Sequence, residues 1–337
     1  MAEENIDRRY LWFQKRPVRR ESKSSHTMKL YVGVTDDRWF RFLREQSPDE
    51  VNFWRPRAST AFRALQPGEP FLFKLHSPNN VVAGGGFFVR HSVLPLSLAW
   101  EAFGRKNGAD GIDTLRERIA SYRKDGVRNP QVGCTILVEP FFFDEEDWIP
   151  VPRDWAPNIV SGKGYVTEER EGARLWQAVQ ERLHRYRWQE AVKEPADERY
   201  ALNPERYGSE FITRARLGQG AFRVLVTDAY QRRCAISGER TLPVLQASHI
   251  KPFAMCGPNH PDNGMLLRSD LHILFDRGYL TVTPDYEIEV SGRIRDEFEN
   301  GRDYYRYHGG SLQNLPKGNE SPRRSFLEWH NENLYLG

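Results

Sequence analysis

Four polar residues in the second half of the chain have the types and spacing of a hydrolytic site: His249, Asn263, His272 and Asp276. His272 and Asp276 are four positions apart in a segment with helical spacing, so both project from one face, where an imidazole and a carboxylate can bind a divalent metal ion. His249 ends a predicted strand, and an imidazole with a pKa of about 6.5 is a suitable base at neutral pH. This set predicts metal-assisted phosphodiester hydrolysis.

The elements around these residues must bring them together. The sequence predicts a strand over 242–250, a loop, a strand ending at 265–267, and a helix that starts at Ser269 or Asp270 and is capped by one of them. Taken singly, Asn263 before Gly264 is a good turn, and Asp276 is compatible with a helix C-terminal cap. In this order and context, the set favours one site in which Asn263 pins the hairpin by hydrogen bonds.

The segments "CAISGERTLPVLQASHIKPFA" and "NGMLLRSDLHILFDRGYLTV" resemble the HNH endonuclease family, which has the ββα-metal fold. The resemblance covers about residues 222–290. It implies that His249 is the general base, that Asn263 fixes the hairpin, and that His272 is a catalytic metal ligand. Asp276 occupies the place where some members have a further metal-binding histidine, so the implied metal ligands are His272 and Asp276.

Two departures from the family pattern concern metal binding. Ser248 stands where many HNH nucleases have a metal-ligating acid or histidine before the base. Cys234 is followed by Ser237 where a structural zinc site would have a second cysteine. We therefore expect a divalent cofactor such as Mg²⁺ or Mn²⁺, no structural zinc, and a buried apolar role for Cys234.

The N-terminal half alternates predicted strands with short helices, which indicates an α+β module. The stretch "EVNFWRPRAST" is predicted as loop-like, with an aromatic residue and basic neighbours that can stack a base and bind phosphate. Its strands resemble PUA-like modules, including EVE-type and SRA-type readers of modified cytosine, which implies a β-barrel-type domain. The expected contacts to DNA or to a modified base come from Trp39, Asn52, Trp54, Arg55 and Arg57.

The predicted domain organisation is α+β throughout. Its parts are a basic arm at 1–27, a PUA-like base-reading domain at 28–160, a helical linker at 161–208, and a ββα-metal HNH domain at 209–337.

Composition sets limits on location and partners. The net charge of +3 by itself favours no partner, and three scattered cysteines are too few for a disulfide framework. No stretch approaches the roughly 20 apolar residues of a membrane span, and the first residues lack the apolar core of a signal peptide. These features predict a cytoplasmic protein with no membrane partner.

The combined expectation is a metal-dependent endonuclease that restricts foreign double-stranded DNA carrying a modified cytosine, such as a methylated or hydroxymethylated one. HNH sites often cut one strand each, so cleavage of both strands would favour a homodimer. Two alternatives stay open. One is a nuclease on DNA or RNA that ignores modification, and the other is a DNA-binding protein whose catalytic site has decayed, which only Ser248 favours.

Overall fold

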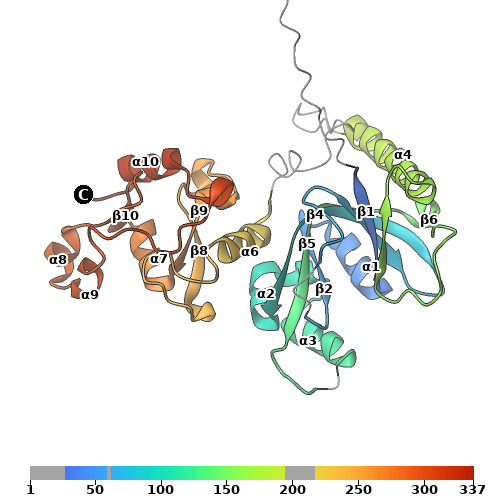
Figure 1. The fold of residues 1–337 in the computed structure, drawn as a ribbon, viewed down its shortest axis with the longest axis horizontal. Coiled ribbons are helices and arrows are strands. Elements are labelled where there is room, and N and C mark those ends of the chain that lie inside the picture. Colours follow the sequence, from blue (N-terminus) through green and yellow to red (C-terminus); the bar gives the residue numbers. More distant parts are fainter. Residues whose placement is uncertain (1–26, 59–61, 124, 194–216) are drawn as a thin grey trace, which may run out of the picture.

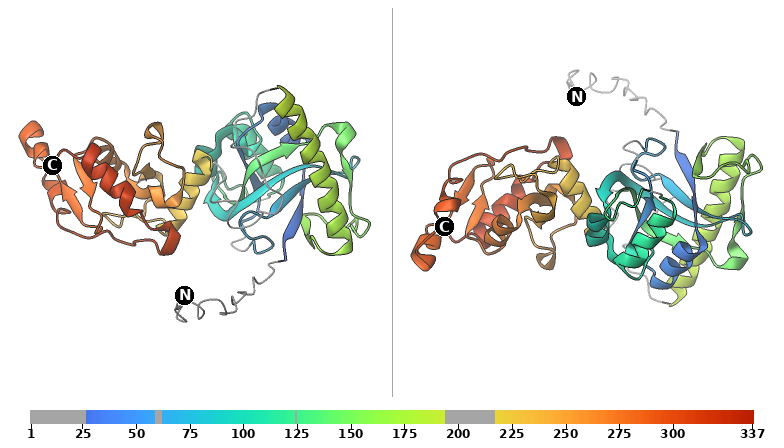
Figure 2. Two further views of the ribbon diagram at one scale, coloured as in Figure 1. Left: turned by 90° about the horizontal axis from the view of Figure 1, so that it is seen from above. Right: turned by 90° about the horizontal axis from the view of Figure 1, so that it is seen from below.

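The structure is a computed structural model that describes residues 27–58, 62–123, 125–193 and 217–337 of the 337-residue chain. It contains two domains that lie side by side and are joined at helix α6 (Gln219–Ala229) (Figures 1 and 2). We refer to residues 28–193 as the N-terminal domain and to 230–337 as the C-terminal domain. The predicted basic arm, apart from Thr27, and residues 194–208 of the predicted linker lie outside the described residues.

One mixed sheet forms the centre of the N-terminal domain. Its strands follow the order β2-β5-β4-β3-β1-β7, with β6 paired to β4. Only the β1–β3 pair is parallel. The strands are β1 (Lys29–Thr35), β2 (Glu50–Arg55), β3 (Pro70–Leu75), β4 (Val81–Pro95), β5 (Gln131–Phe142), β6 (Ile149–Pro150) and β7 (Gly162–Val166).

Helices cover both faces of this sheet because both faces are apolar. In β3, Phe71 and Phe73 belong to the core on one side, while Leu72 belongs to the core on the other. Helix α1, capped by the Asp36 side chain as predicted, packs Trp39 and nearby residues on the first side. The helices on the second side are α2 (Leu96–Phe103), α3 (Ile112–Ser121) and α4 (Arg170–Lys193), and α1 spans Asp37–Gln46.

The mixed α+β class is confirmed, but the expected barrel is not. Strands β2 and β7 stand at opposite ends of the described sheet and do not pair with each other, so the sheet is open. The stretch "EVNFWRPRAST", predicted as loop-like, is a strand over most of its length. Asn52, Trp54 and Arg55 lie in β2, which pairs with β5 over its whole length.

The N-terminal domain extends past the predicted boundary at residue 160. Strand β7 pairs antiparallel with β1, and α4 buries Leu175, Trp176 and Val179 in the same core as the sheet. The described part of the predicted linker therefore packs as part of the N-terminal domain. No helix in the described ranges has the length and apolarity needed to cross a membrane.

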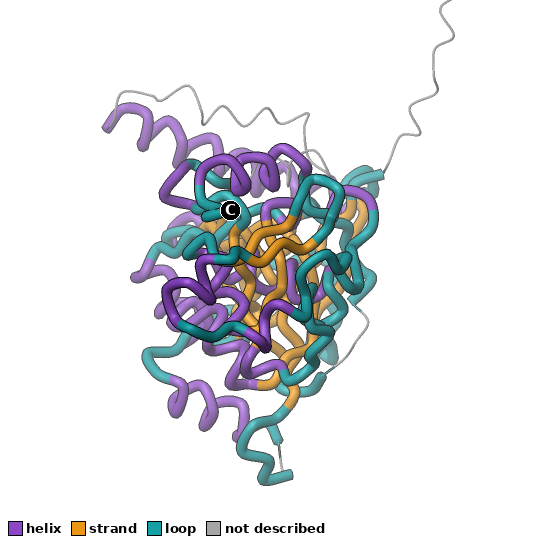
Figure 3. The backbone as a smooth tube through the Cα atoms, turned by 90° about the vertical axis from the view of Figure 1, so that its left-hand side faces the viewer, coloured by secondary structure: helices purple, strands orange, loops and turns teal. Residues whose placement is uncertain are grey.

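The C-terminal domain is built on two hairpins and short helices, seen end-on in Figure 3. Helix α7 directly follows the first hairpin, and its N-cap is Arg268, one residue before the predicted cap, without a side-chain capping bond. The elements are β8 (Leu245–His249), β9 (Gly264–Arg268), α7 (Ser269–Asp276), β10 (Leu280–Val282), β11 (Ile288–Val290), α8 (Arg293–Phe298), α9 (Arg302–Tyr305) and α10 (Arg324–Asn333).

Helix α6 packs against both domains. Ala221, Val224 and Leu225 belong to the N-terminal core, whereas Phe222 and Val226 belong to the C-terminal core. Residues three and four apart share a helix face, so these two sets form two apolar stripes. The helix is thus buried from two sides and forms the contact between the domains.

A buried carboxylate holds the start of α6 to the N-terminal sheet. Glu50, on β2, is fully buried and accepts hydrogen bonds of 2.9 Å from the backbone N–H groups of Gly220 and Ala221. Lys106 Nζ lies 2.9 Å from the same carboxylate. Gly218 leaves room for it, since a Cβ there would lie 2.2 Å from the Glu50 carboxyl carbon. The first N–H groups of a helix lack intrahelical partners, and Glu50 satisfies two of them.

Candidate active site

The β8–β9 hairpin and helix α7 position the four residues singled out by spacing. His249 ends β8 and pairs across the hairpin with Gly264, the residue after Asn263. His272 and Asp276 lie one turn apart on α7, which begins where β9 ends. Because strand, loop and helix follow each other without interruption, residues 249–276 form one compact unit.

His249 is half-buried against α6. Its ring stacks on Phe222 with centroids 4.0 Å apart and an interplanar angle of 9°. Its Nε2 lies 2.8 Å from Asn259 Oδ1. Burial lowers the pKa of His249 below the ordinary value, although the Asn259 hydrogen bond and the charge of Asp276 favour the protonated form. The ring is therefore neutral at neutral pH, which is the form that a base requires.

Close packing brings the hairpin and α6 into contact around His249. Gly264 opposes His249, and a Cβ at that position would lie 2.4 Å from Val226 Cγ2 and 3.0 Å from the Phe222 ring. Only a residue without a side chain lets β9 approach α6 this closely. The absence of a side chain at Gly264 thus leaves room for Phe222 to stack on the imidazole of His249.

Asn263 is fully buried and ties the long loop of the hairpin together. Its Oδ1 accepts from Lys251 N at 2.9 Å, and its Nδ2 donates to Lys251 O and Pro258 O, both at 3.0 Å. These bonds join the start and the middle of the 250–263 loop. They are the kind of contact that the family resemblance implied for Asn263.

His272 and Asp276 form a direct pair on α7. His272 Nε2 lies 3.1 Å from Asp276 Oδ2, and His272 Nδ1 lies 2.7 Å from Gln246 Oε1 on β8. The two ring nitrogens of His272 therefore each face an oxygen atom, one of Gln246 and one of Asp276. Ser248 is buried with its hydroxyl 3.5 Å from Asp276 Oδ1. Ser248 thus contacts the carboxylate where other family members have a ligand of their own.

This pair fits a divalent cation that keeps part of its water shell. The described residues contain no cluster of three or more His, Cys, Asp or Glu side chains arranged to hold a metal ion. His272 and Asp276 offer one nitrogen and one carboxylate, and Asp276 is half exposed. Mg²⁺ is commonly bound by one or two carboxylates, with water and substrate phosphate completing the shell. A bound cation would neutralise phosphate charge and stabilise the leaving oxygen.

The family comparison agrees with this geometry. Residues 234–283 match the model of the HNH endonuclease family. The chain carries an HNH endonuclease domain. The match includes all four residues of the site and begins at Cys234, which is buried in the core of the domain. The Cys234 sulfur accepts backbone N–H groups from Ser237 and Arg268 at 3.4 and 3.3 Å.

Comparisons beyond the HNH domain are distant. Two mutant forms of the ZmASCH protein from Zymomonas mobilis align with TM-scores of 0.28 and 0.29 at 11% and 12% identity, and each alignment covers 96% of that protein and 44% or 45% of this chain. A modification-dependent TagI restriction endonuclease aligns with a TM-score of 0.26 at 14% identity over 85% of this chain and 75% of that one. Scores this low do not establish a shared fold. No curated protein matches the sequence.

The five N-terminal residues predicted to contact DNA do not form one surface. Trp39 and Asn52 are buried, and Asn52 Nδ2 donates to Asn107 Oδ1 at 2.9 Å inside the domain. Trp54 is half-buried, with its indole N–H on Asn107 O at 2.9 Å. This placement assigns internal contacts to three of the five.

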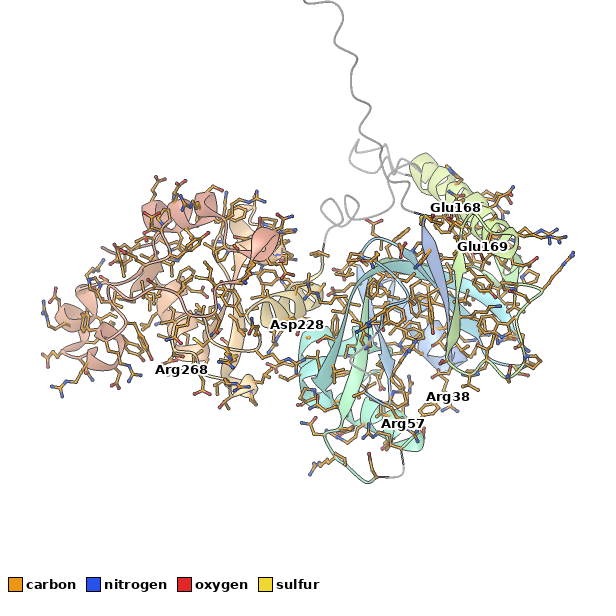
Figure 4. All side chains as sticks on the ribbon, viewed as in Figure 1. Arg38, Arg57, Glu168, Glu169, Asp228 and Arg268 are labelled. Carbon is orange, nitrogen blue, oxygen red and sulfur yellow. The ribbon has the colours of Figure 1, made fainter. Side chains whose placement is uncertain are left out.

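Arg55 and Arg57 remain available near the surface. Arg55 donates to Tyr31 OH at 3.0 Å, and its guanidinium lies 5.4 Å from the centre of the Phe62 ring. Arg57, labelled in Figure 4, lines an open cavity of about 570 Å³ together with Arg123. Of the predicted set, these two cations can reach a ligand.

Three residues of the HNH site were not found from the sequence: Phe222, Gln246 and Asn259. Gln246 carried a usable signal, because alternation along a strand places it and Ser248 on one side. Phe222 and Asn259 had no such sequence signal. Phe222 contacts His249 from helix α6, and Asn259 contacts it through the conformation of the hairpin loop.

Proposed function

We propose that the protein is a metal-dependent endonuclease that cleaves double-stranded DNA. One observation supports the proposal above all: residues 234–283 match the HNH family, and this stretch carries His249 on β8 and the His272–Asp276 pair on the helix that directly follows the hairpin. HNH domains act on nucleic acid, and a base beside a cation site suits phosphodiester hydrolysis.

In the proposed reaction, His249 takes a proton from water while the water oxygen forms a bond to phosphorus. The bond from phosphorus to the 3′-oxygen breaks, and solvent protonates the leaving oxygen. His272 and Asp276 would hold a divalent cation, whose charge would stabilise the phosphate and the leaving oxygen. The lowered pKa of His249 means that the rate should fall with decreasing pH only below the ordinary imidazole value of 6.5.

The test is nicking of supercoiled plasmid with Mg²⁺ or Mn²⁺ by the wild type and by His249→Ala. The variant should lose about 10² to 10⁴-fold in kcat with unchanged DNA affinity, because a base lowers the barrier and does not hold phosphate. His184→Ala is the matched control, since His184 is exposed on α4 of the other domain. Equal rates for wild type and His249→Ala, or no metal-dependent cleavage by either, would refute the proposal.

We further propose that the N-terminal domain is a PUA-like module that selects DNA with a modified cytosine, as in restriction of foreign DNA. A cavity of about 320 Å³ supports this, as small-ligand sites begin near 300 Å³ and the Arg55 guanidinium lies over the ring of Phe62, one of its lining residues. It lies next to the domain junction, where Asp228 of α6 is labelled in Figure 4. The cavity is lined by Phe62, Pro67, Phe88, Val89, Arg90, His91 and Asp228.

The chemistry of this cavity suits a flipped base. Phe62 and Phe88, with ring centres 5.4 Å apart, offer apolar faces for stacking. Asp228 offers a carboxyl group whose pKa is raised by burial and which accepts the Ser92 hydroxyl at 3.3 Å. A carboxyl group can pair with the exocyclic amine of cytosine. Asp228 belongs to α6, which also carries Phe222. A base bound in the cavity would therefore contact the helix that packs against His249.

Matched plasmids with unmodified, methylated and hydroxymethylated cytosine test this selection. Wild type should cleave one modified substrate preferentially, and Phe62→Ala should lose the preference while keeping cleavage. Tyr122→Ala serves as control because Tyr122 is an exposed aromatic residue of the same domain. Equal cleavage of all substrates by the wild type would refute this selection and would indicate a nuclease that ignores modification.

Cleavage of both strands would require two copies of the protein, which sedimentation of the protein on DNA would reveal.

A further inference from the structure

One amide side chain connects His249 to the segment that enters α6. Asn259, in the loop of the hairpin, places Oδ1 2.8 Å from His249 Nε2. Its Nδ2 lies 2.8 Å from the backbone carbonyl of Leu217, two residues before α6 begins. Leu217 itself is buried in the N-terminal core. The amide is therefore held between the histidine and a fixed backbone group.

The orientation of this amide follows from its partners. A backbone carbonyl only accepts hydrogen bonds, so the NH₂ group of Asn259 must face Leu217 and its oxygen must face His249. An amide oxygen also only accepts, so His249 Nε2 must carry a proton. In the neutral ring the second nitrogen, Nδ1, then holds a lone pair.

We infer that Asn259 is a positioning residue that fixes the tautomer of His249 and makes Nδ1 the atom that takes a proton from water. Phe222 fixes the plane of the ring, and Asn259 fixes its rotation and protonation. When Nδ1 accepts the proton, the imidazolium keeps its Nε2–H bond to Asn259, and it returns the Nδ1 proton to solvent afterwards. The catalytic part of this inference rests on the proposed nuclease function, whereas the tautomer does not.

Two substitutions separate this role from a merely structural one. Asn259→Ala removes the acceptor and the donor, and we expect kcat to fall about tenfold to 100-fold with KM and DNA affinity unchanged, as for other groups that orient a functional histidine. Asn259→Asp keeps an acceptor for His249 but loses the donor to Leu217. If Asn259 acts on His249, the Asp variant retains more activity than the Ala variant.

A structural role predicts the reverse pattern. If Asn259 only anchors Leu217, the Asp variant should be as impaired as the Ala variant or more so, because a carboxylate would face the Leu217 carbonyl. That result would overturn the inference. Asn333→Ala is the matched control, since Asn333 is exposed on α10 of the same domain.

The tautomer can be measured without any cleavage. Long-range proton–nitrogen NMR correlations on protein labelled with ¹⁵N-histidine report which ring nitrogen carries the proton, and His249→Ala assigns the signal. We expect Nε2 protonated in the wild type and a mixture of tautomers in Asn259→Ala. A wild-type His249 protonated at Nδ1 would refute the inference. A wild type with the expected tautomer but no cleavage of any DNA would instead refute the nuclease proposal and leave the tautomer assignment standing.

Discussion

The buried polar side chains of the N-terminal sheet and those of the β8–β9 hairpin form hydrogen bonds over different separations along the chain. In the N-terminal domain, Glu50 binds the start of α6, 170 and 171 residues away, and Asn52 binds Asn107, 55 residues away. In the HNH domain, Asn263 binds Lys251 at a separation of 12, and His249 binds Asn259 at a separation of 10. Long-range pairs need the whole domain in place, whereas short-range pairs need only a hairpin and its loop.

This difference explains what each domain contributes. The HNH site is assembled from one continuous segment, which residues outside it support at two points, with Phe222 beneath the His249 ring and the Leu217 carbonyl on Asn259. The N-terminal domain offers a sheet whose polar groups mostly serve its own core and its contact with α6. The residues of the HNH site therefore lie close together in sequence, whereas the buried polar contacts of the N-terminal sheet depend on long-range packing.

The sharpest test of local assembly is Asn263→Ala, which we expect to destabilise the HNH domain by about 4 kcal/mol. It removes three hydrogen bonds to partly buried backbone groups of Lys251 and Pro258, at the lower end of roughly 1–3 kcal/mol each. Hydrogen exchange should show lost protection in residues 245–276 and none in the N-terminal sheet. Loss across both domains would break the comparison, and Asn333→Ala should show neither effect.

Acid should weaken the HNH domain through His330, whose pKa burial lowers to about 4. His330 is fully buried, with Nδ1 2.8 Å from Thr281 Oγ1 and Nε2 3.1 Å from Phe275 O. Between pH 6.5 and 4 the unfolded chain binds a proton that the folded chain does not, so stability falls with falling pH, by about 3 kcal/mol in total.

Urea unfolding followed by hydrogen exchange at several pH values measures this loss for each domain. His330→Gln removes the titrating group, so its HNH domain should lose less stability over the same range. If the unfolding free energy of that variant depends on pH as strongly as that of the wild type, other groups cause the acid sensitivity.

Asp276→Asn should raise the Mg²⁺ concentration needed for half-maximal cleavage by about tenfold to 100-fold, because a neutral amide is a poorer ligand than a carboxylate. The rate should partly recover at high Mg²⁺, unlike the rate of His249→Ala. Asp285→Asn is the control, as Asp285 is exposed in the same domain. Metal titrations of plasmid nicking give both values, and an unshifted midpoint for Asp276→Asn would remove it from the metal site.

Glu50→Gln should have the smallest effect. We expect it to lower the free energy of the contact between the N-terminal sheet and the start of α6 by about 1–2 kcal/mol. The neutral amide keeps one acceptor for two N–H groups and weakens the attraction to Lys106. Faster hydrogen exchange at Gly220 and Ala221, with the HNH hairpin unaffected, would support a long-range role. Glu117→Gln, at an exposed position on α3, is the matched control.

Several features followed from the sequence because they depend on neighbours along the chain. The β8–β9 hairpin and helix α7 both follow from periodicity and turn residues. The spacing of His249, Asn263, His272 and Asp276 indicated a hydrolytic metal site, the resemblance of the surrounding segments implied an HNH domain, and the family match at 234–283 supports that domain. Local geometry limits where such closely spaced residues can lie.

Tertiary structure decided the rest. Trp39 and Asn52 have types that suit a DNA contact, yet the pairing of β2 with β5 and the packing of α1 bury them. Likewise, Phe222 meets His249 only because α6 packs against the hairpin, and Asn259 is held in place by the Leu217 carbonyl at the start of α6. The sequence alone determined which side chains could do the chemistry. Which residues support the His249 ring and which aromatic residues stay accessible depended on contacts between distant segments, because burial and hydrogen-bond partners are properties of the packed chain.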